Sequence, residues 1–203
     1  MTTFRHFYVK STKGVTDAKK INLKDIPGTS GRLDIIARSI NAAFWLSNNI
    51  RRNVVFHTIL HGMPDPPVYM RFEGEKMRKI SPDERSIILF ILKALEKTRE
   101  NEVESTPGVF VSRKNFEKFI EENRDKRIYL LMEDGKPMDD INFKNEEDYL
   151  FILGDNLDLS EEERQIAIEA GATPFSIGKT SYLTSHCIVV INWYLDMLER
   201  EVE

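Results

Sequence analysis

The sequence has almost no cysteine and no long apolar run. Its 203 residues contain a single cysteine, Cys187, so no disulfide can form within the chain and nothing indicates an oxidising compartment. No uninterrupted apolar stretch approaches the roughly 20 residues that a membrane-spanning helix needs, and the amino-terminal MTTFRHFYVK has no apolar signal core. The Cys and His clusters that hold structural zinc are missing as well. We therefore expect a cytoplasmic protein without membrane contact or a metal site.

Acidic residues are scarce at the start of the chain. Residues 1–60 contain ten Lys or Arg, three Asp and no Glu, a net charge of +7, although the whole chain carries −4. The remaining residues, 61–203, carry −11. A basic section on an acidic chain is typical of a surface that faces a polyanion. The alternative is a set of solvated lysines and arginines without a partner.

The spacing of apolar residues predicts alternating strands and helices. Ser81-Pro82-Asp83-Glu84 indicates a helix start, with Ser81 as N-cap and Glu84 completing a capping box. Ser160 and Glu163 indicate a second capping box. The expected strands are 4–10, 53–60, 68–74, 128–132, 148–154 and 172–177, and residues 109–112 are expected as a short strand or a loop. The expected helices are 32–47, 81–97, 113–123, 160–170 and 184–199. This order predicts an α/β fold with a mainly parallel sheet in one domain.

The stretch GATPFSIGKTSYLTSHC, residues 171–187, contains Gly-Lys-Thr, the end of a phosphate-binding loop. Such a loop also needs a glycine five positions before its second glycine, where this chain has Thr173. Only one helix follows, and no later strand could carry an Asp for magnesium. The spacing therefore argues against triphosphate binding.

The same stretch still offers a ligand site. Gly178 follows a predicted strand, and Gly154 and Leu131 stand at the ends of two others. Ligands of open α/β sheets bind at the carboxyl ends of the strands, and glycine lets a ligand approach the backbone closely. The alternative is that Gly154 and Gly178 are ordinary turn residues.

Five ordered motifs carry a family resemblance. They are PGTSGRLDIIARSINAAFWLSNNIRRNVVF, SPDERS, STPGVFV, FILGDNLDLSEEE and SIGKTSYLTSHC. The sequence resembles the TrmY family over roughly residues 4–198. The members are SPOUT-class methyltransferases that act on N1 of pseudouridine at position 54 of archaeal tRNA. The resemblance implies the same reaction here, with the tRNA T-loop as the partner.

The resemblance also implies the fold and its division of labour. A SPOUT-type trefoil-knotted α/β fold would have a mainly parallel sheet flanked by helices, with the carboxyl-terminal segment threaded through a preceding loop. Residues 1–203 would form one domain. Residues 1–75 would contribute a basic RNA-facing section, and residues 127–200 the knotted cofactor-binding part.

The implied cofactor is S-adenosylmethionine. Its contacts, carried over by position, are Leu131, Gly154, Ser176, Ile177, Gly178, Lys179, Thr180, Ser181, Leu183 and Cys187. Relatives often have a proline and a glutamate in the middle of this loop, so the roles of Lys179 and Ser181 stay open. Cys187 is expected to pack against the cofactor without covalent chemistry, and a small core residue is the alternative.

Arg32 and Asp34 match the Arg-x-Asp element of the family. The resemblance implies that Arg32 holds a phosphate or a carbonyl oxygen of the target base. Asp34 would orient Arg32 or accept the N1 proton. Arg32 and Asp34 are therefore the catalytic candidates. The alternative is that Asp34 only pairs with Arg38 along the helix. The candidate RNA-binding residues are Arg32, Arg38, Arg51 and Arg52.

The last helix has two apolar stripes, which favour a homodimer formed through this helix. The stripes are Ile188, Ile191, Leu195 and Leu198, and Cys187, Val190, Tyr194 and Met197. The alternative is a helix buried within a monomer. For the function, two alternatives also stay open: the same chemistry on ribosomal or another RNA, and a non-catalytic module that binds RNA or a nucleotide.

Overall fold

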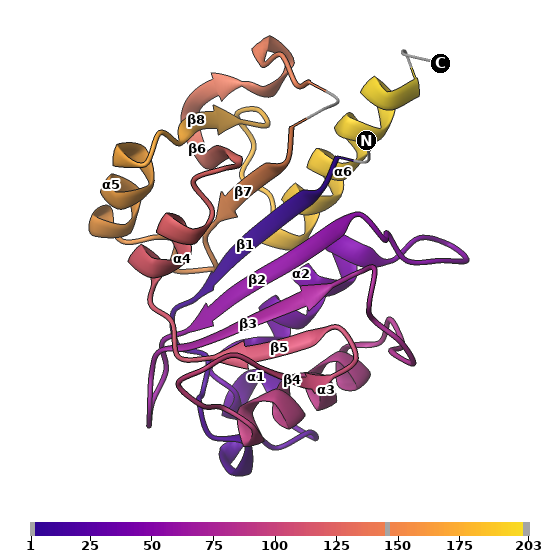
Figure 1. Cartoon of the computed structure of the whole chain (residues 1–203), viewed down its shortest axis with the longest axis vertical. Coiled ribbons are helices and arrows are strands. Elements are labelled where there is room, and N and C mark those ends of the chain that lie inside the picture. Colours follow the sequence, from indigo (N-terminus) through magenta and orange to yellow (C-terminus); the bar gives the residue numbers. More distant parts are fainter. Residues whose placement is uncertain (1–2, 145–146, 201–203) are drawn as a thin grey trace.

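The computed structural model describes residues 3–144 and 147–200 (Figure 1). The strands of this part of the chain are β1 (Arg5–Ser11), β2 (Val54–Leu60), β3 (Val68–Glu73), β4 (Val103–Thr106), β5 (Val109–Ser112), β6 (Arg127–Pro137), β7 (Tyr149–Leu153) and β8 (Thr173–Ser176). The helices are η1 (Ala18–Lys20), α1 (Ile26–Thr29), α2 (Leu33–Phe44), α3 (Glu84–Glu96), α4 (Phe116–Glu122), η2 (Met138–Asp140), α5 (Glu161–Glu169) and α6 (Thr184–Arg200). No helix among these residues is long and apolar enough to cross a bilayer.

All eight strands belong to one sheet, in the order β4-β5-β3-β2-β1-β7-β6-β8. The strands from β2 to β8 in this order pair in parallel, whereas β3, β5 and β4 add an antiparallel edge. The mainly parallel sheet with flanking helices is therefore confirmed. Strand β1 lies at the centre, between β2 and β7, and joins the two ends of the chain in one sheet.

Helices cover both faces of the sheet (Figure 1). Alternate residues of β1 point to opposite faces, because side chains alternate along a strand. Phe7 and Val9 pack in the core beneath α2, α3 and α6, and Tyr8 packs in the second core beneath α4 and α5. Both cores consist of aromatic and branched aliphatic side chains, so burial on two sides explains the nearly continuous apolar strands.

Two local predictions need correction. Helix α3 begins at Glu84 instead of after Ser81, because the carboxylate of Asp83 accepts the backbone N–H of Ser86 at 2.8 Å and takes the N-cap position. Strand β4 was not predicted, because VEST is short and polar; a turn with Gly108 at φ +78° pairs it with β5. The second capping box, between Ser160 and Glu163, is confirmed.

The end of β6 folds closely around β8. Phe175 of β8 pairs in register with Leu131 and again with Lys136, so the intervening residues bulge out of the ladder. Gly135 lies directly on Phe175, where a Cβ atom would come within 2.5 Å of its backbone. Strand β6 therefore continues to Pro137, beyond the predicted strand 128–132. This crossing is consistent with a knot, and the threading itself stays a prediction.

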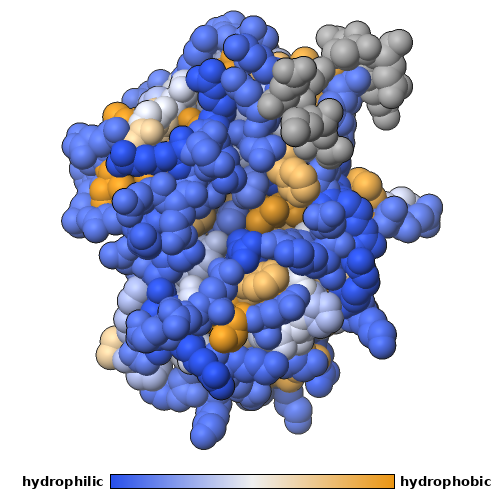
Figure 2. Space-filling model, viewed as in Figure 1, coloured by the Kyte–Doolittle hydropathy of each residue, from blue (hydrophilic) through white to orange (hydrophobic). Residues whose placement is uncertain are grey.

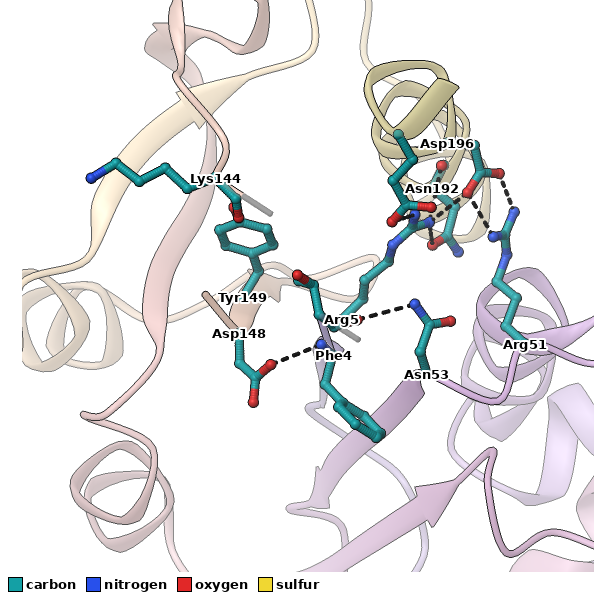
Figure 3. Close-up of polar contacts among 11 residues, drawn as sticks. Phe4, Arg5, Arg51, Asn53, Lys144, Asp148, Tyr149, Asn192 and Asp196 are labelled. Carbon is teal, nitrogen blue, oxygen red and sulfur yellow. Dashed lines mark hydrogen bonds and ion pairs between the residues drawn. The ribbon is translucent and has the colours of Figure 1, made fainter. Parts of the chain in front are cut away.

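A buried arginine ties the first strand to the last helix (Figure 3). The side chain of Arg5 is 1% exposed and donates to the backbone and side-chain oxygens of Asn192 at 3.2 and 3.1 Å. It also pairs with Asp196 and Glu199, both at 2.8 Å. Arg51 binds the same Asp196 carboxylate at 2.6 Å. Burial alone would raise the pKa of Asp196, but the hydrogen bonds from the two arginines hold it below its ordinary value.

Replacing Arg5 should destabilise the protein strongly. Arg5→Met removes one partner of a buried ionic network, which typically costs about 3–5 kcal/mol. Urea unfolding followed by circular dichroism measures this free energy. The matched control is Arg127→Met, because Arg127 pairs with Glu147 on the surface and should leave the unfolding midpoint nearly unchanged. Equal midpoints for the two variants would contradict the structural role given to Arg5.

Candidate active site

A cavity of about 700 Å³ lies at the carboxyl ends of β7 and β8 and beside the middle of β6, just beyond Leu130, where the parallel pairing of β6 with β7 ends. Its volume falls within the roughly 300–1,000 Å³ of small-molecule sites. It is lined by Leu131, Met132, Glu133, Asp134, Leu153, Gly154, Asp155, Asn156, Asp158, Arg164, Ser176, Ile177, Gly178, Thr180, Ser181, Tyr182, Thr184 and Cys187. The position agrees with the rule that ligands of parallel sheets bind where the strands end.

The structure brings most of the predicted cofactor residues together. Eight of the ten line this cavity: Leu131, Gly154, Ser176, Ile177, Gly178, Thr180, Ser181 and Cys187. Lys179 and Leu183 belong to the same loop, but they are exposed and do not line the cavity. Ser181 donates a hydrogen bond to the carboxylate of Glu133 on the β6 side, which gives its side chain a position on the cavity wall.

The loop between β8 and α6 is held by short-range contacts. Gly178 has φ +125°, and a Cβ atom there would meet nothing within 4 Å, so the backbone faces open space. The hydroxyl of Ser176 accepts from the Gly178 N–H at 3.1 Å, and the hydroxyl of Thr184 donates to the Gly154 carbonyl at 2.8 Å. Helix α6 begins only at Thr184, so no helix amino terminus meets Gly-Lys-Thr. This geometry differs from that of a phosphate-binding loop.

The cavity is acidic. Its carboxylates are Glu133, Asp134, Asp155 and Asp158, and its one guanidinium, Arg164, pairs with Asp158 at 2.6 Å. Such a lining favours a ligand with a positive charge and repels a triphosphate. Sequence reasoning missed these acids, because Glu133 and Asp134 stand in the bulged part of β6 and Asp155 and Asp158 in the turn after β7, where no periodic pattern marks them.

Asp155 connects the cavity to the segment that follows β1. Its carboxylate accepts from the backbone N–H of Thr12 at 2.7 Å, from the Thr12 hydroxyl at 3.0 Å and from the Leu157 N–H at 2.9 Å. A carboxylate that accepts several hydrogen bonds is held firmly in one orientation. The only sequence signal for this residue was its place directly after Gly154.

Arg32 and Asp34 form a fixed pair at the start of α2. Arg32 has φ +69°, a left-handed conformation that is costly for a residue other than glycine and that is typical of functional sites. Asp34 is 1% exposed; its two carboxylate oxygens accept from Arg32 at 2.9 and 3.1 Å, and Arg38 donates at 2.8 Å. Burial alone would raise the pKa of Asp34, but the hydrogen bonds from both arginines lower it below its ordinary value.

The four candidate RNA-binding arginines do not share one surface. Arg32 and Arg38 belong to the beginning and middle of α2, and their side chains are 43% and 44% exposed. Arg51 and Arg52 precede β2 and thus lie at the opposite, amino-terminal edge of the parallel strands. Arg51 is bound to Asp196, as Figure 3 shows, and Arg52 donates to the backbone carbonyls of Gly74 and Met77. The side chains of Arg51 and Arg52 are therefore bound to other groups of the same molecule.

The sequence profile of one protein family, described as "Putative SAM-dependent RNA methyltransferase", matches residues 4–200. The chain belongs to this family. Members of similar sequence include proteins named tRNA (pseudouridine(54)-N(1))-methyltransferase from two archaea. The protein of Methanococcus maripaludis strain C5 is 44% identical over 198 residues, which cover 96% of this chain and 100% of the relative. The protein of Methanocaldococcus jannaschii is 39% identical over 201 residues, covering 95% and 96%.

Solved structures of other methyltransferases share the fold of this chain. Nep1 of Archaeoglobus fulgidus, in a crystal structure with S-adenosylhomocysteine, is 12% identical and superposes with a TM-score of 0.65, covering 98% of this chain and 100% of Nep1. Ribosomal RNA small subunit methyltransferase E of Neisseria gonorrhoeae, bound to S-adenosyl methionine, is 11% identical with a TM-score of 0.50, covering 98% and 68%. At such low identity these likenesses concern the fold alone.

The buried position of Cys187 in the cavity wall predicts that its thiol reacts slowly. Burial raises the pKa of its thiol to about 11, so the reactive thiolate should be about 300-fold scarcer at neutral pH than for a free cysteine of pKa about 8.5. In the folded protein we expect iodoacetamide to alkylate Cys187 slowly at pH 7.5, as followed by mass spectrometry. After unfolding in urea, the alkylation rate should equal that of a free thiol. The native rate should rise about tenfold per pH unit until pH 11. A native rate equal to the unfolded rate would contradict this environment.

Proposed function

We propose that the protein transfers the methyl group of S-adenosylmethionine to N1 of pseudouridine 54 in tRNA. The observation that carries this proposal is the end-to-end similarity to the archaeal enzymes of that name, together with a family match over residues 4–200, the range that contains the cavity residues and the Arg32–Asp34 pair. The reaction forms a bond between N1 and the methyl carbon, breaks the sulfur–methyl bond and releases the N1 proton. The products are the N1-methylated base and S-adenosylhomocysteine.

The residues of the cavity fit this cofactor. S-adenosylmethionine, when bound, supplies a methyl group on a positively charged sulfonium. Apolar side chains such as Leu131, Leu153 and Cys187 suit an adenine ring, and the open space at Gly178 lets the ring approach the backbone closely. The carboxylates of the lining favour a cation over a phosphate. Leu131, Gly154 and the loop residues 176–183, together with Cys187, would hold the molecule.

Arg32 is the proposed catalytic residue, and Asp34 positions it. Loss of the N1 proton places negative charge on the carbonyl oxygens of the ring, which a nearby guanidinium stabilises. Asp34 is a poor proton acceptor, because its pKa is lowered and both of its oxygens already accept hydrogen bonds. We therefore assign Asp34 the orienting role out of the two that the family resemblance left open.

The proposed RNA contact involves the T-loop and the carboxyl edge of the sheet. Arg32 stands at the start of α2 on this edge, and the guanidinium of Arg38 reaches back one turn to Asp34 at 2.8 Å, which favours these two over Arg51 and Arg52 as RNA-binding residues. Residues 1–75 would form the RNA-facing section of a single domain, and residues 127–200 the cofactor-binding part. The target base would have to leave its stack to reach the cavity, as in other base-modifying enzymes. The cytoplasmic location stays a prediction.

The homodimer is proposed through the exposed face of α6, which holds Met197 alone of the two stripes of the sequence pattern. Ile188, Ile191 and Leu195 are buried in the core of the same chain, and most of the second stripe packs there too. Apolar exposure remains at Val189 (50%), Trp193 (58%) and Met197 (37%), which follow one another at four-residue spacing on the same face of the helix. An exposed tryptophan is typical of interface centres. A monomeric mass by light scattering would contradict this assembly.

The decisive experiment compares two tRNA transcripts with this protein and labelled S-adenosylmethionine. One transcript carries pseudouridine at position 54 and the other carries uridine there. We expect methyl transfer to the first and none to the second. In pseudouridine the sugar is attached to a ring carbon, so N1 is free to accept a methyl group, whereas in uridine N1 carries the sugar. Mass mapping should place the methyl group at position 54. Equal transfer to both transcripts, or transfer to ribosomal RNA alone, would overturn the proposal.

Substitution of Arg32 should separate catalysis from cofactor binding. Arg32→Ala should lower kcat by about 100- to 1,000-fold, the usual effect of removing a donor that stabilises developing charge. The affinity for S-adenosylhomocysteine, measured by calorimetry, should stay within about twofold of the unchanged protein, since Arg32 does not line the cavity. Arg85→Ala, an exposed arginine of α3, is the matched control and should behave as wild type. Loss of cofactor affinity in Arg32→Ala would show that Arg32 acts in the cofactor site.

A further inference from the structure

The segment between β1 and α2 carries a group of lysines that no motif singled out. We call residues 13–24 the basic arm; its lysines are Lys13, Lys19, Lys20 and Lys24, and all four are exposed. The arm leaves the carboxyl end of β1, the edge of the sheet that also bears the cavity and Arg32. In Figure 1 this indigo segment forms the lower end of the molecule, and Figure 2 shows hydrophilic side chains projecting there.

The acidic side chains of this region accept hydrogen bonds from backbone N–H groups. The carboxylate of Asp17 accepts from the Lys19 N–H at 3.0 Å and caps η1, and that of Asp25 accepts from the Gly28 N–H at 3.1 Å and caps α1. Among residues 3–144 and 147–200, no carboxylate forms an ion pair with any of the four lysines of the arm. Their charges therefore face solvent, unlike those of Arg51, Arg71 or Arg113, which are paired.

The backbone of the arm is firmly held. The Val15 N–H donates to the Ser30 carbonyl at 2.9 Å, and the Gly62 N–H donates to the Gly14 carbonyl at 2.9 Å. Gly31 lies so close to Lys13 that a Cβ atom would come within 1.7 Å of the Lys13 carbonyl oxygen. Gly31 directly precedes Arg32, so the arm is packed against the neighbour in sequence of the residue proposed to act on the target base. A fixed set of charges loses less entropy on binding than charges on a mobile tail.

We propose that the basic arm is a phosphate-binding surface that holds the RNA backbone next to the target nucleoside. The inference rests on the proposed function for the identity of the RNA. Along one edge of the sheet, the acidic cavity repels phosphates and the arm attracts them, so the RNA backbone lies over the arm while the base approaches the cavity. The arm, instead of Arg51 and Arg52, then supplies the main electrostatic part of RNA binding.

The test neutralises the arm and measures tRNA binding. The variant carries K13Q, K19Q, K20Q and K24Q, and fluorescence anisotropy follows a labelled tRNA transcript in the presence of S-adenosylhomocysteine at several salt concentrations. We expect the Kd to rise about 10- to 100-fold at low salt. The slope of log Kd against log salt concentration should fall by about 3, because each phosphate contact contributes roughly 0.7–0.9.

A control variant of equal net charge separates a local surface from general electrostatics. It carries K79Q, K93Q, K118Q and K144Q, which replace four exposed lysines elsewhere on the molecule. The control should bind tRNA within about twofold of wild type, and both variants should keep the wild-type affinity for S-adenosylhomocysteine. An arm variant with unchanged Kd and salt slope, or a control that weakens binding equally, would overturn the inference. Wild-type protein that binds tRNA without methylating it would instead contradict the proposed function and leave the binding comparison valid.

Discussion

The buried ionic network of Arg5 is the interaction on which the arrangement of the molecule depends. A guanidinium that has lost its water needs hydrogen-bond partners, and α6 supplies them to Nη1 and Nη2 of Arg5 from Asn192, Asp196 and Glu199. Because Arg5 starts the central strand, this requirement fixes the last helix against the first strand. At the other end of β1, Thr12 binds Asp155 of the cavity. One strand thus sets the position of both the cofactor loop and the segment that leads to Arg32.

Charge is divided sharply along the edge where the parallel strands end. Carboxylates line the cavity, whereas unpaired lysines cover the neighbouring arm. The net charge of the chain hides this division, since the negative total comes from residues 61–203, which follow the arm in the sequence. For a reaction between a cationic donor and a polyanionic substrate, such a pattern places each reactant on a surface of opposite sign.

Much of the fold could be predicted from the sequence, because strands buried on both faces are continuously apolar and helix starts carry capping residues. The family motifs identified the loop that begins at Ser176, and also Cys187, as candidate cofactor contacts. Arg51 and Arg52 lie at the edge of the sheet opposite Arg32, which a count of charges along the chain does not reveal, and their part in RNA binding stays a prediction. Helix α2 has 12 residues, about 18 Å of rise, and carries the chain back to the amino edge of the sheet. Glu133 and Asp134 reach the cavity only because β6 folds around β8, which no local pattern encodes.

The central place of β1 has a consequence for how this architecture can change. Strand β1 belongs to the amino-terminal part of the chain, yet it pairs with β7, and its first residue is neutralised by α6. The part proposed to face RNA and the part proposed to bind the cofactor are therefore not interchangeable modules. A chimaera that took residues 1–75 from one homologue and the remainder from another would have to keep the Arg5–Asp196 and Thr12–Asp155 partnerships intact. Substrate range can drift more freely in the lysines of the arm, whose side chains have no partner to preserve within the described chain.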